Sequence, residues 1–145
     1  MRTKAAIFLV GLTAVLTLAA ACGGGGGDPV ADTAWKMIQL GPRGFPVPAM
    51  FLVDVTIEFS ADGTTIKGSG GCNSYSGRYT LVGDAFSTSN LSWTEIDCTE
   101  PQGISEQEAR YFEILTSVDS FFIRDNKLTM NAPGEELLVF LRTGP

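Results

Sequence analysis

Apolar and polar positions alternate most clearly between Val53 and Phe59, where every second residue is apolar and the residues between them are polar or acidic. Successive side chains of a strand point to opposite faces, so this pattern predicts a strand with one buried and one solvated face. Shorter stretches of the same kind predict a strand at 65–70 and a hairpin formed by 77–82 and 85–93.

The segment before these strands combines a strand with a proline-rich stretch. Residues 34–40 predict the first strand of the domain, which ends at the turn former Gly41. Residues 41–50 contain three prolines. Because proline has no N–H to donate to a neighbouring strand, we expect this segment to be a loop.

One segment has the period of a helix. Ser105 and Glu108 match a capping box, in which both side chains bond to the backbone of the first helical turn. Tyr111, Leu115 and Val118 then recur on one face, which we expect to pack on the sheet. Turn formers separate three further predicted strands, at residues 121–125, 127–131 and 136–142.

The first 22 residues have the composition of an export signal. A basic start precedes an apolar run from Ala5 to Ala21 that is short for a membrane span and ends in small residues. Small residues directly before Cys22 resemble a bacterial lipobox, in which the cysteine becomes the lipid-modified first residue of the mature protein. Ala19 departs from that pattern, because leucine is most usual there. The alternatives are an ordinary signal peptide with an incidental cysteine and an uncleaved anchor.

Residues 23–33 are rich in glycine and show no apolar period, which predicts a flexible tether with a typical reach of about 18 Å. The folded domain is then expected at 34–142, held at a membrane on its extracytoplasmic side. Gly23 stands where an aspartate would favour retention at an inner membrane. The periplasmic face of an outer membrane is therefore expected, if the host has one.

The three cysteines are an odd number for an oxidising compartment. If Cys22 carries lipid, Cys72 and Cys98 remain to form a disulfide. The chain-entropy model values the loop that it closes at about 3.5 kcal/mol. Two separate buried thiols are the alternative.

Charge and composition exclude several functions. Without the two basic residues of the signal, eight Lys and Arg remain of ten, against 16 Asp and Glu. A net charge near −8 argues against nucleic acid as a partner. The sequence contains no His, the usual catalytic base and metal ligand. Glu95, Asp97 and Glu100 do not have the spacing of an EF-hand calcium loop. We therefore expect a protein that is not an enzyme, with no metal site and no cofactor.

Four glycines surround Cys72 in the sequence GSGGCNSYSGRY at 68–79. Glycine within a strand usually marks a bulge, a sharp bend or a close backbone approach. We expect a bend where a short sheet curls over the helix. A phosphate-binding loop is excluded, because neither a Lys-Ser pair nor a helix follows.

The pattern G-x-G-G-C-N-x-Y-x-G-x-Y, with a tryptophan strand before it and W-T-x-x-x-C and an acidic helix after it, resembles the META domain family of HslJ-like envelope proteins. The matching residues are Trp35, Gly68, Gly71, Cys72, Asn73, Tyr75, Gly77, Tyr79, Thr94, Cys98 and Glu108. Ile96 and Asp97 replace the small apolar residues that the family carries before its second cysteine, and the insertion at 41–50 is longer than usual.

The resemblance implies an α+β fold, in which a curved antiparallel sheet forms a partial barrel with one helix packed across it. It also implies links to heat or envelope stress, to drug tolerance and, in some members, to secretion or motility. No catalytic residues come with the family.

Two function classes follow. The first is a membrane-anchored, non-enzymatic module that binds an envelope protein or acts as a chaperone. The second is a carrier of lipid or of a hydrophobic small molecule inside the curled sheet, with Phe45 of the 41–50 loop at the entrance. Trp35, Trp93 and Phe121 are then either core residues or part of the cavity lining. A weaker hypothesis is a lysozyme inhibitor, because Ser76–Tyr79 resembles the inhibitory motif of small periplasmic barrels.

Overall fold

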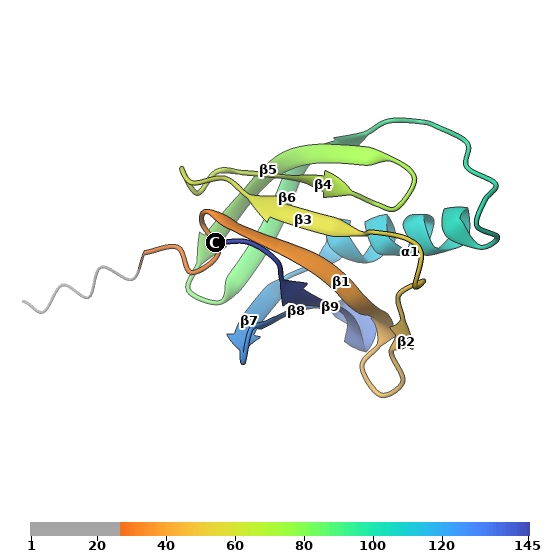
Figure 1. Cartoon of the computed structure of the whole chain (residues 1–145). Helices are drawn as coiled ribbons and strands as arrows, with labels where there is room; N and C mark the ends of the chain where they lie inside the picture. Colours follow the sequence, from red (N-terminus) through yellow and green to blue (C-terminus); the bar gives the residue numbers. More distant parts are fainter. Residues whose placement is uncertain (1–26) are drawn as a thin grey trace, which may run out of the picture.

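The computed structural model describes residues 27–145, which form a curved antiparallel sheet and one helix packed against it (Figure 1). The predicted α+β fold is therefore confirmed. The elements in chain order are β1 (Thr33–Pro42), β2 (Val47–Pro48), β3 (Thr56–Phe59), β4 (Thr65–Ser69), β5 (Ser74–Val82), β6 (Ala85–Trp93), α1 (Ile104–Ser117), β7 (Ser120–Arg124), β8 (Lys127–Ala132), the short 3₁₀ helix η1 (Pro133–Glu135) and β9 (Glu136–Arg142).

The sheet runs in the order β2-β1-β3-β4-β5-β6-β7-β8-β9, and β9 also pairs with β1. The sheet thus curves until its last strand meets its first. The junctions differ in strength: β1 and β9 pair along most of their length, whereas β6 and β7 share a single residue pair, Ala85 with Ser120. Helix α1 lies in the chain between these two strands and covers the side of the sheet where they diverge (Figure 1).

The core lies between α1 and the inner face of the sheet. Tyr111 and Leu115 are fully buried and Val118, just after the end of α1, is 4 % exposed, which confirms the predicted apolar face. The largest fully buried side chains of the strands are Trp35, Met37 and Phe140, of which Phe140 packs against Tyr111. The interior of the curved sheet is therefore filled by side chains.

The predicted alternation of buried and exposed side chains from Val53 to Phe59 is confirmed. The predicted strand is confirmed only for part of this segment. Val53 and Val55 are buried, yet β3 begins at Thr56. The reason lies in β1, which changes partner along its length. Its N-terminal half pairs with β3, whereas Gln39 and Leu40 pair with β2. The ladder between β1 and β3 therefore ends near Val55, whose C=O accepts the N–H of Met37 at 2.8 Å.

The prediction that 41–50 is entirely loop is wrong at two places. Strand β1 continues through Gly41 to Pro42, where it pairs with Leu137 and Glu136 of β9. Val47 and Pro48 form the short edge strand β2. Both prolines stand at the end of a strand, where a missing N–H disrupts little of the ladder.

The folded domain begins before the predicted boundary at residue 34. Asp28 accepts hydrogen bonds from the N–H of Val30 at 2.9 Å and from the hydroxyl of Tyr79 at 2.5 Å. Val30 is 1 % exposed. Residues 28–33 are therefore part of the domain, and the predicted tether at 23–33 is too long by this segment.

The predicted signal peptide and Cys22 lie outside the described residues. Within residues 27–145, no helix has the length and the apolar character that crossing a membrane requires.

We predict that the contact between Tyr79 and Asp28 makes stability fall in alkali. Burial raises the pKa of Tyr79 above 10.0, and its hydrogen bond to Asp28 raises the pKa further. A phenol whose pKa is raised by folding contributes stability that is complete below the unfolded pKa and is lost as the pH rises above it. The free energy of unfolding in urea should therefore fall above about pH 10, and fall less steeply in Tyr79→Phe.

Burial also raises the pKa of Tyr75 and Tyr111, so part of the alkaline loss should remain in the Tyr79→Phe protein. Equal slopes in the variant and the parent would contradict the role given to Tyr79.

Candidate functional site

The first residues of the glycine-cysteine motif, 68–73, lie at one corner of the domain. This corner is the turn between β4 and β5, and it contacts the segment that follows β6 and the first turns of α1. A disulfide joins Cys72 of the corner to Cys98, with 6.0 Å between their Cα atoms. The predicted disulfide is therefore present in the structure, and the alternative of two separate thiols is not.

Glu108 fastens α1 to this corner. One carboxylate oxygen accepts the N–H groups of Cys72 at 3.1 Å and of Asn73 at 2.6 Å, and the other accepts the side-chain amide of Asn73 at 2.7 Å. The side chain is only 7 % exposed. A buried carboxylate is tolerated when donors surround it, and these three N–H groups supply them.

Asn73 extends the same network to the segment after β6. Its side-chain oxygen accepts the Thr94 hydroxyl at 2.7 Å and the N–H of Ile96 at 2.7 Å. Its amide nitrogen donates both to Glu108 and to the C=O of Ile96. Asn73 thus joins the corner, the helix and the segment that carries Cys98.

None of the four glycines of the motif has room for a side chain, and two of them show this most clearly. A Cβ at Gly68 would lie 2.0 Å from the backbone oxygen of Thr56. Gly71 has a φ of +118°, a conformation that other residues rarely adopt, and its Cβ would lie 2.6 Å from the side chain of Val53. The predicted bend and close backbone approach are therefore both present.

The aromatic residues of the motif are core residues. The Tyr75 hydroxyl contacts that of Tyr111 at 2.6 Å and donates to the Thr56 C=O at 2.9 Å. Trp35 is fully buried, and its indole N–H donates to the Thr33 hydroxyl at 2.7 Å. The motif as a whole therefore positions α1 on the sheet and offers few groups to an outside molecule.

The prediction that Ser105 and Glu108 form a capping box is wrong. Helix α1 begins after Gly103, which has a φ of +90°, and no side chain caps the helix. The Ser105 hydroxyl instead donates to the C=O of Cys98 at 2.8 Å, and Glu108 bonds to the corner. Both side chains therefore bond to the two segments that the disulfide joins. The capping-box pattern considers only residues within the helix and does not include such distant partners.

The acidic residues near the second cysteine do not form a site. Glu95, Asp97 and Glu100 are exposed. Among residues 27–145, no group of three or more acidic or cysteine side chains is placed to hold a metal ion. The part of the chain that the structure describes therefore offers no metal centre.

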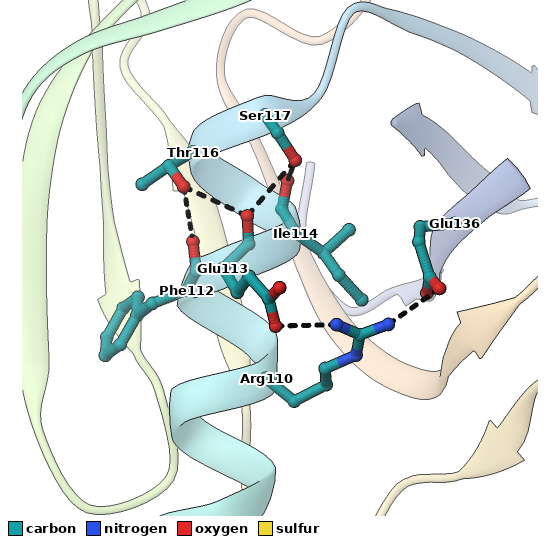
Figure 2. A network of polar contacts seen from close by, with 7 residues as sticks. All are labelled: Arg110, Phe112, Glu113, Ile114, Thr116, Ser117 and Glu136. Carbon is teal, nitrogen blue, oxygen red and sulfur yellow. Dashed lines mark hydrogen bonds and ion pairs between the residues drawn. The ribbon is translucent and has the colours of Figure 1, made fainter. Parts of the chain in front are cut away.

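A surface groove of about 420 Å³ runs between the C-terminal end of β6 and α1. Asn73, Thr94 and Glu108 form part of its lining. The Trp93 ring stacks on Phe112 with 4.6 Å between ring centroids and 11° between planes. Phe112 and Arg110 point to different sides of α1 (Figure 2), although Glu113, an ion-pair partner of Arg110, also lines the groove. Trp93 is 44 % exposed, whereas Trp35 and Phe121 are core residues.

A second surface feature lies in the segment that connects β1 to β3. Four large apolar side chains of this segment point to solvent, and we call them the apolar ridge: Phe45, Val47, Phe51 and Leu52, with exposed fractions of 88, 55, 95 and 81 %. Sequence reasoning singled out only Phe45. Val47 lies between two prolines, and Phe51 and Leu52 lie between the proline-rich stretch and the predicted strand at 53–59, so all three are apolar residues outside a predicted element.

The family model of the META domain matches residues 28–144. The chain belongs to the META domain family. This confirms the resemblance found in the sequence, and the match begins at Asp28, the residue that fixes the start of the folded part. No protein of curated function matches the chain significantly.

Solved structures share the META-like fold at low identity. A protein from Burkholderia xenovorans, solved by NMR, has a TM-score of 0.66 at 23% identity, over 79% of this chain and 83% of that one. A DUF4847 family protein from Bacteroides vulgatus has a TM-score of 0.57 at 14% identity, over 81% of this chain and 96% of that one. At these identities the likeness concerns the fold alone.

We predict that Glu108→Gln destabilises the META domain. The substitution removes one of two acceptor oxygens and places an NH₂ group among N–H donors, so buried donors lose their partner. The expected loss is about 1–3 kcal/mol in the free energy of unfolding, measured by urea denaturation.

Glu106→Gln is the matched control, because Glu106 is an exposed residue in the first turn of the same helix. It should change stability by less than about 0.5 kcal/mol. Equal effects of the two substitutions would contradict the fastening role of Glu108.

Proposed function

We propose that this META domain protein is a membrane-anchored, non-enzymatic binding module of the cell envelope, and that it binds an envelope protein through the apolar ridge. The observation that carries the proposal is the exposure of four large apolar side chains within residues 45–52. Apolar residues scattered singly over a surface are normal, whereas a group of them marks a contact surface.

The ridge is held in place by its neighbours. Strand β2 pairs with β1, and the N–H of Ala49 donates to the C=O of Ile38 at 2.9 Å. The N–H of Met50 donates to the side-chain oxygen of Gln107 on α1 at 2.8 Å. Pro46 and Pro48 restrict the backbone further. A surface that is ordered before binding loses less conformational entropy when its partner arrives, which favours affinity.

The proposed anchor is a lipid on Cys22. Because the folded part begins at Asp28, only the five glycines at 23–27 separate the two. Such a tether has a typical reach of about 12 Å, which keeps the domain near the membrane. Strand β1 leads from this end of the domain to the ridge (Figure 1), and its ten residues span about 33 Å. The ridge therefore lies at the end of β1 that is remote from the proposed anchor.

The two other hypotheses have less support. A carrier needs a cavity, and the interior of the sheet is occupied by Trp35, Tyr111 and Phe140. For the lysozyme inhibitor, Ser76–Tyr79 lies within β5, and Tyr79 is buried and bonded to Asp28. The role in envelope stress or drug tolerance belongs to the same proposal and comes from the family resemblance.

We predict that Cys22→Ala releases the protein from the membrane fraction. Expressed in a bacterial host, the parent should pellet with membranes and incorporate labelled palmitate, and the variant should do neither. A variant that still pellets and resists carbonate extraction would point to an uncleaved apolar anchor instead.

We also predict that the ridge is the site of contact with the partner. A photo-crosslinking amino acid at position 45 should yield one dominant protein adduct in intact cells, identified by mass spectrometry. The double substitution Phe51→Ser and Leu52→Ser should abolish this adduct while leaving the melting temperature within about 2 °C, because both side chains are exposed.

The matched control is Phe122→Ser on β7, which removes a half-exposed phenylalanine elsewhere on the surface. Loss of the adduct in this control as well, or an adduct with lipid and no protein, would contradict binding of a protein through the ridge.

A further inference from the structure

Strand β6 has a free edge beside the groove. On one side it pairs with β5 along its length, and on the other it pairs with β7 at Ala85 only. From Ser87 to Trp93, no strand of the described region pairs with this outer edge. Free edges accept extended peptides, and proteins usually protect them with charged residues or prolines. Strand β6 has neither, although a bulge at Asn90 interrupts it and α1 packs beside it, with the Thr88 hydroxyl donating to the C=O of Leu115 at 3.5 Å. At the Trp93 end, the groove separates the edge from α1.

The backbone of Trp93 faces the groove. The N–H of the next residue, Thr94, donates to the C=O of Ser74 at 3.0 Å and therefore points toward β5. Because N–H and C=O groups alternate in direction along a strand, those of Trp93 point the other way. The end of the free edge thus presents a donor and an acceptor at the groove, next to the Trp93 ring.

The charges around the groove are negative. Glu95, Glu108 and Glu113 line it, and no Lys or Arg does. The partners of Glu108 are N–H groups without a full charge. Arg110 neutralises part of the charge of Glu113, but it also bonds to Glu136 of β9, on the side of α1 away from Phe112 (Figure 2).

The Trp93 ring gives the groove an aromatic surface. It stacks on Phe112 and is 44 % exposed. An aromatic face with carboxylates beside it attracts guanidinium and ammonium groups. The groove therefore combines three features: a backbone edge with no strand partner, an aromatic ring and the exposed carboxylate of Glu95.

We propose that this groove binds an extended segment of a partner protein that carries arginine or lysine. The backbone of the segment pairs with the Trp93 end of β6, and the cationic side chain lies against the Trp93 ring beside the exposed carboxylate of Glu95. Charge complementarity selects this occupant, because an acidic segment or a phosphate would meet only carboxylates. The groove is separate from the apolar ridge, so the inference does not depend on the ridge as a contact surface.

The test uses the full-length protein, purified in a neutral detergent, and a synthetic probe. The probe is an acetylated and amidated nonapeptide in which arginine alternates with valine. Its matched control carries citrulline in place of arginine, which keeps the shape and removes the charge. We expect titration calorimetry to show binding of the arginine peptide and at least tenfold weaker binding of the citrulline peptide, equivalent to about 1.4 kcal/mol.

Variants locate the binding. Glu95→Gln and Trp93→Ala should each weaken binding of the arginine peptide about fivefold or more, whereas Glu135→Gln should leave it unchanged. Glu95 and Glu135 are both exposed, so neither substitution should disturb folding. The ridge variant, Phe51→Ser with Leu52→Ser, should bind the peptide like the parent.

Three results would overturn the proposal: no binding of the arginine peptide at millimolar concentration, equal affinity for arginine and citrulline peptides, or equal losses in Glu95→Gln and Glu135→Gln. A peptide with methylated amides at alternate residues tests the backbone pairing. It should bind at least tenfold more weakly, and unchanged affinity would contradict addition to β6.

Discussion

The position of α1 on the sheet depends on one buried carboxylate. Glu108 accepts three N–H groups from the corner at Cys72 and Asn73, almost out of contact with water. If α1 moved along its axis by one turn, about 5.4 Å, both the carboxylate and its donors would be buried without partners. This constraint places Tyr111 against Tyr75 and Phe112 against Trp93, so it determines both the core packing and the shape of the groove.

The strands, the helix and the disulfide could be predicted from the sequence because each follows from a local pattern or from a count of cysteines. The predictions were wrong where a residue pairs or forms a hydrogen bond with a segment far away in the sequence. Strand β1 extends to Pro42 because β9 pairs with it. The side chain of Glu108 does not cap α1, because it accepts hydrogen bonds from the backbone of the corner instead. The start of the domain was placed too late, since nothing near Asp28 in the sequence indicates its bond to Tyr79.

The difference between local patterns and contacts of distant segments also decides which surfaces could be predicted. The motif that identifies the family points inward and builds the framework, so recognising it indicated the fold and gave little information about binding. The apolar ridge lies outside that motif, in the segment that connects β1 to β3. The groove could not be predicted from the sequence, because it depends on where β6 ends relative to α1 and on Arg110 pointing away from it.

The Cys72–Cys98 bond links the corner to the segment before α1 only under oxidising conditions. It closes the segment between the corner and the start of α1, which contains β5 and β6. In a reducing cytoplasm this bond is absent, and the corner that receives Glu108 lacks its covalent link to the segment at Cys98. Without the disulfide, the attachment of α1 to the corner would rest on the hydrogen bonds of Glu108 and Asn73 alone.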